Sequence, residues 1–235
     1  MPFTPAALEF LRDLERNNNK PWFEAHRSDY ERHVRDPMRG LIEEMDTRLG
    51  RFAPEIAGDP KRSMFRIYRD IRFSKDKSPY KTHAACWFAH RDASHKVGQE
   101  AEGGGAGFYF HLAPRESFVG GGIWMPPRST LNRLRDALAE DHRGFGRIVR
   151  RPSFVRRFGG LDDSAMLKRM PRGFSEDHPA PAWLKLKSFT TGRPLTDNEV
   201  TGPGLPKLLE ADFKLMLPFV RWLNAALGLH PAKHR

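Results

Sequence analysis

The chain has 235 residues, enough for one good hydrophobic core or two small ones, and 39% of them are hydrophobic, which argues against a disordered protein. No run approaches the roughly 20 apolar residues of a membrane-spanning helix, and the N-terminus lacks the basic-then-apolar order of a signal peptide. The single cysteine, Cys86, excludes an internal disulfide framework or a Cys-rich metal site. The formal net charge of +11 leaves anionic partners in consideration, and we expect a soluble, cytoplasmic protein with no membrane partner.

The first fifty residues have apolar side chains at helical spacing. Thr4 and Pro5 are typical of a helix start, because Thr caps the free N–H groups and Pro in the first turn loses no hydrogen bond. The run 17–19, three Asn, ends this helix. A second helix is expected from Pro21 to about residue 52, and Pro37 kinks it or splits it in two.

The segment 62–126 predicts an antiparallel sheet. Residues 64–73 alternate between apolar and polar side chains, which is typical of a half-buried strand, and residues 74–79 follow as a loop. Further strands are expected at 83–90, 108–112 and 118–125, the last two joined as a hairpin. The Gly-rich run 103–107 precedes a strand, so it is predicted to be a flexible loop and not a dinucleotide site.

Helical spacing returns after residue 127. Short helices are expected over 127–170, then an ordered loop with a short helix, and finally a helix at about 206–228 that is kinked near Pro218. The order of elements predicts one α+β domain covering residues 1–235, in which helical parts from both chain ends (5–55 and 127–229) pack on an antiparallel sheet (62–126).

Positive charge is concentrated in one segment. Residues 61–81 hold eight Lys or Arg and two acids, a net charge of +6, whereas the other 214 residues hold 32 basic and 27 acidic residues, a net charge of +5. More than half of the net charge therefore lies in 21 residues, which indicates a local site and not a basic coat.

Four segments resemble one known family. They are 17-NNNKPWFEAHRSDYE-31, 69-RDIRFSKDKSPYKT-82, 119-VGGGIWMP-126 and 171-PRGFSEDHP-179 with the Leu-Lys-rich stretch after it. In this order they are similar to the widespread, mostly bacterial family labelled domain of unknown function 2461. The resemblance covers nearly the whole chain and implies a single cytosolic domain. It brings no activity, cofactor or catalytic residue.

We interpret the basic segment as an anion-binding site for a ligand with a phosphate or carboxylate. Arg can grip such a group through two hydrogen bonds, and Lys adds mobile point charges. Asp70 lies between Arg residues, which depress its pKa, so it would orient guanidinium groups and not act as a base. Tyr80 would form a wall. The candidate ligand-binding residues are Arg66, Arg69, Asp70, Arg72, Lys75, Lys77, Tyr80 and Lys81.

Three alternatives stay open. The first is an internal salt-bridge network, in which Arg69 or Arg72 pairs with an acid such as Asp70, Asp76, Glu24 or Glu31. The second is an enzyme acting on a phosphorylated small molecule. The third is a non-specific nucleic-acid binder that also uses the basic region around 147–157, whose Arg residues are interleaved with Phe154 and Phe158. No cofactor motif is present and the His residues lack metal-ligand spacing, so neither a cofactor nor a metal is predicted.

Two further features have more than one interpretation. The segment 17–22 is a turn between helices, with Asn19 and Trp22 as candidate borders of the anion site. The three Gly residues at 120–122 lie inside a strand pattern, next to Trp124. They indicate a close approach, either by a ligand or by a helix packed on the sheet.

Overall fold

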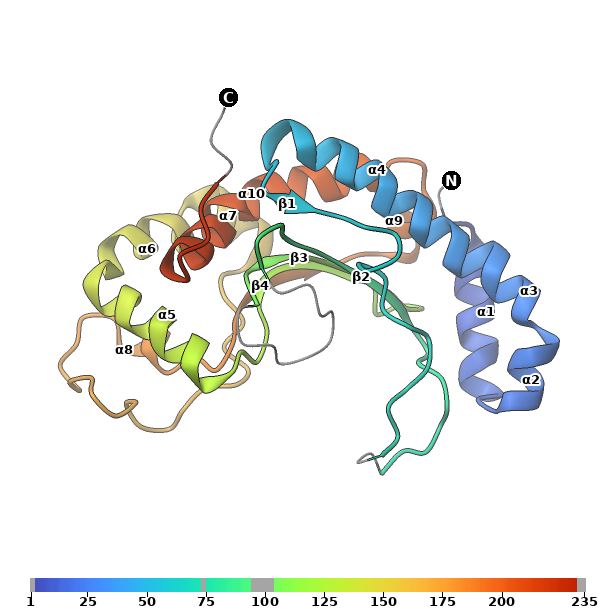
Figure 1. Cartoon of the computed structure of the whole chain (residues 1–235), viewed down its shortest axis with the longest axis horizontal. Coiled ribbons are helices and arrows are strands. Elements are labelled where there is room, and N and C mark those ends of the chain that lie inside the picture. Colours follow the sequence, from blue (N-terminus) through green and yellow to red (C-terminus); the bar gives the residue numbers. More distant parts are fainter. Residues whose placement is uncertain (1–2, 73–74, 94–103, 232–235) are drawn as a thin grey trace.

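The computed structural model describes residues 3–72, 75–93 and 104–231, which contain a five-stranded antiparallel sheet in the order β1-β2-β3-β4-β5. The strands are β1 (Ile56–Ala57), β2 (Ala84–His90), β3 (Gly107–Leu112), β4 (Phe118–Ile123) and β5 (Phe189–Pro194). The sheet is arched (Figure 1), and helices from both chain ends pack on it, which confirms the predicted α+β class. Residues 73, 74 and 94–103 lie outside the described residues, and with them the end of the predicted strand 64–73, the start of the predicted loop 74–79 and the start of the Gly-rich run 103–107.

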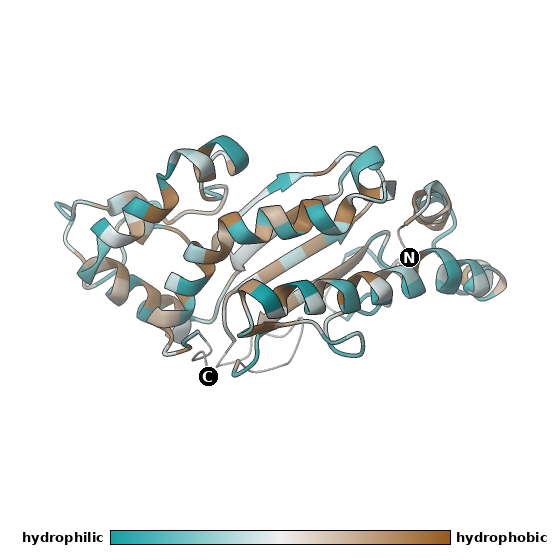
Figure 2. Cartoon of the chain, turned by 90° about the horizontal axis from the view of Figure 1, so that it is seen from above, coloured by the Kyte–Doolittle hydropathy of each residue, from teal (hydrophilic) through white to brown (hydrophobic). Residues whose placement is uncertain are grey.

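The helices before the sheet are α1 (Pro5–Arg16), α2 (Lys20–Ala25), α3 (Arg27–Tyr30), the π-helical turn η1 (Glu31–Arg35) and α4 (Asp36–Phe52). Those that follow β4 are α5 (Arg128–Glu140), α6 (His142–Val149), α7 (Pro152–Phe158), α8 (Pro181–Leu184), α9 (Asp197–Thr201) and α10 (Leu205–Ala226). The long helices α4 and α10 lie on the convex face of the arch (Figure 1), while α1–α3 and α5–α8 lie at its two ends. Seen from above, hydrophobic and hydrophilic residues alternate along both long helices (Figure 2), as expected for helices with one buried face.

The hydrophobic core lies between the convex face and these two helices. Phe213 of α10 stacks on Phe108 of β3 at a ring-centroid distance of 4.4 Å and meets Phe88 of β2 edge-on at 5.6 Å. A Cβ atom on Gly121 would lie 2.9 Å from Sδ of Met216, so the glycine allows α10 to approach β4. The helix-packing interpretation of 120–122 is therefore correct for Gly121.

A buried carboxylate joins α10 to its neighbours. Asp212 is fully buried and pairs with Arg157 of α7 and with Arg193 of β5. The carboxylate lies between two guanidinium groups and therefore ties β5 to α7 and α10. Removal of either Arg would leave the buried negative charge of Asp212 with only one of its two partners, which is energetically unfavourable.

Residues 64–72, predicted as part of a strand 64–73, form no regular strand of the sheet. They run as an extended ribbon beside the start of β2 and the segment before it, joined by isolated bridges at Met64–Cys86 and Tyr68–Tyr80. The predicted second helix is also divided. Pro37 lies in the first turn of α4, where it needs no N–H partner, and the π-helical turn η1 precedes it.

The segment 127–229, predicted to be helical, also contains β5. This strand, 189-FTTGRP-194, pairs with β4 over its whole length and completes the sheet. Its Gly and Pro disfavour a strand, so the local pattern did not reveal it. The β3–β4 hairpin and the final helix with Pro218 inside it are as predicted.

Candidate functional site

The concave face of the sheet, opposite α4 and α10, is lined by aromatic side chains. Trp87 and Tyr109 are partners in the β2–β3 register, and His111 and Phe118 are partners in the β3–β4 register, so alternation places all four on this face. Trp87, Tyr109 and Phe118 line a groove of about 1280 Å³, together with Trp124 from the loop after β4. We call this space the concave groove. It exceeds the roughly 300–1,000 Å³ of ordinary small-ligand pockets.

The rings on this face form a continuous layer. Tyr109 contacts Phe118 at a ring-centroid distance of 5.4 Å, and His111 stacks on Phe118 at 4.7 Å. His83 lies next to His111 at 4.3 Å. Burial lowers the pKa of His83 to about 4 and that of His111 to about 3. Both imidazoles are therefore neutral at pH 7 and behave as flat, weakly polar rings.

The rim of the concave groove exposes large apolar side chains. Trp124 has 75% of its surface exposed, Met125 40% and Phe118 39%. Within the described residues, the other exposed large apolar side chains include Tyr68 and Ile71, both on the ribbon beside the groove. A solvent-exposed surface on which large apolar side chains gather in this way is typical of an interaction site.

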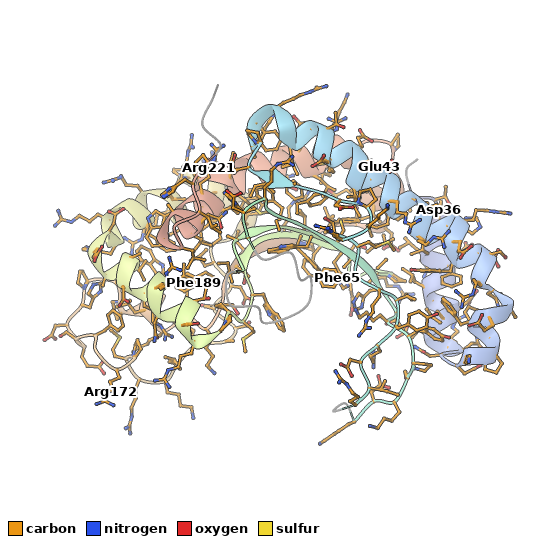
Figure 3. The ribbon with its side chains drawn as sticks, viewed as in Figure 1. Asp36, Glu43, Phe65, Arg172, Phe189 and Arg221 are labelled. Carbon is orange, nitrogen blue, oxygen red and sulfur yellow. The ribbon has the colours of Figure 1, made fainter. Side chains whose placement is uncertain are left out.

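The basic ribbon, residues 62–72 and 75–83, extends from the sheet on its concave side (Figure 1). We call it the basic arm. Its two segments pair through backbone hydrogen bonds, from Arg69 N to Pro79 O at 2.9 Å and from Lys81 N to Ile67 O at 2.8 Å. Figure 3 shows Phe65 near the end of the sheet from which the arm extends.

The N-terminal helices hold the basic arm. Nδ2 of Asn18 donates to Tyr80 O at 2.9 Å, and Tyr80 N donates to Oδ1 of Asn18 at 3.0 Å, so one amide satisfies both backbone groups of Tyr80. The Tyr80 ring is buried and stacks on Phe23 of α2 at 4.0 Å. Asn19 instead caps α2 by accepting from Trp22 N. The segment 17–22 thus positions the arm.

Several predicted ligand residues pair within the arm. Arg72 donates to both carboxylate oxygens of Asp70, and this interaction lowers the pKa of Asp70 to about 2. Arg69 pairs with Asp76, and Nζ of Lys77 donates to a backbone carbonyl, Ile71 O, at 2.9 Å. These contacts are of the kind expected for a salt-bridge network. They orient the two arginines and Lys77 within the arm.

Four predicted cations have no carboxylate at ion-pair distance among the residues described: Arg66, Lys75, Lys77 and Lys81. Nζ of Lys81 lies 5.5 Å from the ring centroid of Phe65, which in turn contacts Tyr109 at 5.9 Å. Burial, with the nearby charges of Arg66 and Arg69, lowers the pKa of Lys81. Lys81 therefore lies within electrostatic range of Arg66 and Arg69, where the basic arm meets the aromatic layer. Lys75 is exposed farther along the arm.

The groove aromatics were not predicted as site residues. In 108-FYFHL-112 rings occur at successive positions, so both faces of β3 are aromatic, and this is the signal that could have revealed a second aromatic face. The second basic region, 147–157, is partly structural. Arg157 pairs with Asp212, and the guanidinium of Arg150 lies 4.8 Å from the ring centroid of Trp183.

Other classes of site receive no support within the described residues. They contain no group of three or more His, Cys, Asp or Glu that could hold a metal ion. Cys86 is fully buried, and burial raises the pKa of its thiol, which disfavours a nucleophilic thiolate. In this part of the chain no helix is both long and apolar enough to cross a bilayer.

Comparison with known proteins gives one match. The family model described as a conserved hypothetical protein (DUF2461) matches residues 6–222, which confirms the resemblance of the sequence motifs. No curated protein and no solved structure matches the chain.

Proposed function

The chain belongs to the DUF2461 family, and we propose that it binds an anionic small molecule, with the basic arm holding a phosphate or carboxylate and the concave groove holding the remainder of the ligand. The observation that carries this proposal is the position of Lys81, which lies against Phe65 at the end of the aromatic layer and within electrostatic range of Arg66 and Arg69.

Mutual repulsion of these cations favours an anion. The pKa of Lys81 is lowered partly by Arg66 and Arg69, so the three charges destabilise one another in the free protein. A phosphate or carboxylate between them would remove that repulsion and accept charge-assisted hydrogen bonds. Arg69 is already oriented by Asp76, which reduces the entropy lost when its guanidinium binds a ligand.

The charge of the groove favours a small ligand over a polyanion. Acids and arginines both line it within the described part of the chain: Asp46, Asp59, Glu116, Asp162, Arg62, Arg91 and Arg193. A nucleic-acid channel would instead present positive charge along its whole length, because each phosphate needs a cation. The balanced lining indicates a ligand with an anionic end and a largely uncharged body.

Isothermal titration calorimetry with pyrophosphate, ribose 5-phosphate and citrate, at low and high salt, tests the proposal. Lys81→Met removes the charge and keeps an apolar stem on Phe65. A charged hydrogen bond contributes about 1.5–3 kcal/mol, so we expect binding of the preferred anion to weaken roughly 10- to 100-fold. The matched control is Lys207→Met, on an exposed position of α10.

Equal affinities of the wild type and Lys81→Met would contradict the proposal, as would the absence of binding by any of the three anions. Circular dichroism and the melting temperature of Lys81→Met show whether the variant keeps its fold. Binding that occurs only to oligonucleotides, with a steep salt dependence, would favour the nucleic-acid alternative.

A further inference from the structure

The floor of the concave groove is open at Gly120. A Cβ atom there would lie 3.1 Å from Thr191 O and 4.0 Å from Cε2 of Phe118, with no other heavy atom near it. At Gly122 and Gly192 a Cβ would clash with backbone oxygens at 1.9 and 2.5 Å, so sheet geometry requires those glycines. Gly120 is different. Its missing side chain leaves space above the sheet, next to Phe118 in the lining of the groove.

Aromatic rings border this open floor. Tyr109 is the register partner of Gly120 on β3, and Phe118 lies two residues before it on the same face of β4. Gly192 is the partner on the other side. A side-chain-free strip beside two contacting rings is a flat platform, and a planar ring can stack on it with favourable energy.

A buried hydroxyl is available beside the platform. Thr190, the register partner of Gly122, lines the groove, and its Oγ1 is buried with no hydrogen-bond partner among the described residues. Buried polar atoms in native proteins are normally satisfied, so an unpaired one in a groove points to a ligand heteroatom. A purely hydrocarbon ring would leave this hydroxyl unpaired.

The acids of the groove are partly engaged. Asp46 accepts from Gly58 N, Asp59 accepts from Lys61 N, and Asp162 accepts from Ser164 N, so one oxygen of each carboxylate has a protein partner. The side-chain-free strip beside two contacting rings is flat, and it therefore suits a planar heteroaromatic ring better than a puckered carbohydrate ring.

We propose that the ligand is a nucleotide, whose base stacks on the Gly120 platform while its phosphates reach the cations of the basic arm. This inference rests on the proposed function. Contacts run from Lys81 to Phe65, from Phe65 to Tyr109 and from Tyr109 to Phe118, each between 5.4 and 5.9 Å. Base and anion must thus be separated by a spacer, which the ribose and the inner phosphate of a nucleoside diphosphate provide.

Calorimetric titration of the full chain with ADP, GDP, CDP, UDP, ribose 5-phosphate and pyrophosphate tests this inference. We expect at least one nucleoside diphosphate to bind about tenfold more tightly than ribose 5-phosphate, the amount expected from base stacking. Phe118→Ala should remove this advantage and leave pyrophosphate affinity unchanged. Phe118 is partly exposed, so the truncation leaves the fold intact. Thr190→Val, which keeps the shape and removes the hydroxyl, should weaken the nucleotide about three- to tenfold.

The outcomes separate the two proposals. If pyrophosphate binds and Lys81→Met weakens it, but no nucleoside diphosphate exceeds ribose 5-phosphate, the anion site stands and the nucleotide inference is wrong. If Phe118→Ala and Thr190→Val both leave the ratio of nucleotide to pyrophosphate affinity unchanged, the platform is not the base site. If pyrophosphate binds equally to the wild type and Lys81→Met, the anion site itself is wrong.

Discussion

Replacing Asn18 with Ala removes both hydrogen bonds between its side chain and the backbone of Tyr80, at 2.9 and 3.0 Å. Each such bond contributes about 0.5–1.5 kcal/mol net, so together they stabilise the closed position of the basic arm by about 2 kcal/mol. The Phe23–Tyr80 stack remains, and the rest of the protein keeps its core. We therefore expect the arm to open locally more often, without global unfolding.

Hydrogen exchange measured by mass spectrometry tests this expectation. The amides of Arg69 and Lys81 donate across the arm and exchange only when it opens. A loss of about 2 kcal/mol corresponds to roughly 30-fold faster exchange of these amides, because 1.4 kcal/mol is a factor of ten. Peptides from β3 and α10 should exchange at the wild-type rate.

The matched control is Asn17→Ala. The Asn17 side chain donates to Asp13 O at the exposed end of α1 and makes no contact with the arm among the hydrogen bonds described. Its substitution should change exchange in the arm by less than about threefold, since exposed hydrogen bonds of this kind contribute little. Equal exchange in the two variants, or unchanged exchange in Asn18→Ala, would refute the role of Asn18 as the clamp of the arm.

Two further predictions concern stability. Gly121→Ala should lower the free energy of unfolding by about 1–3 kcal/mol, because the new Cβ meets Sδ of Met216 at 2.9 Å. Gly50→Ala in α4, where the new Cβ meets open space, should instead raise the free energy of unfolding by about 0.5–1 kcal/mol. Urea unfolding of both variants checks this contrast, and similar effects of the two substitutions would contradict it. Burial depresses the pKa of His83 to about 4 and that of His111 to about 3. The stability that these two neutral imidazoles contribute is fully present above the unfolded pKa of about 6.5, and it is lost as pH falls towards the folded pKa values. The melting temperature should therefore decline from pH 7 to pH 4. His83→Gln should flatten that decline, and an identical pH profile would show that other groups cause it.

Part of the basic arm was predictable because its signal is local. The density of Lys and Arg in 61–81 is visible in the sequence, and it identified Arg66, Arg69 and Lys81 as candidate contacts. The role of Tyr80 as a wall of the site stays a prediction, and the structure places its ring in the core against Phe23. Burial of that ring depends on helix α2, some sixty residues away, which no local pattern can place.

Short-range periodicity, turn chemistry and composition were enough to predict the family, the α+β class, the first and last helices, the β3–β4 hairpin and the concentration of positive charge. They could not predict which face of the sheet is core and which is groove, because that depends on long-range packing. Alternation assigns Phe108 and Tyr109 to opposite faces, but both are aromatic, so the pattern cannot say which face the helices cover. Packing of Phe213 on Phe108 settles that question, because once α4 and α10 cover the convex face, the rings on the other face have only the groove to occupy.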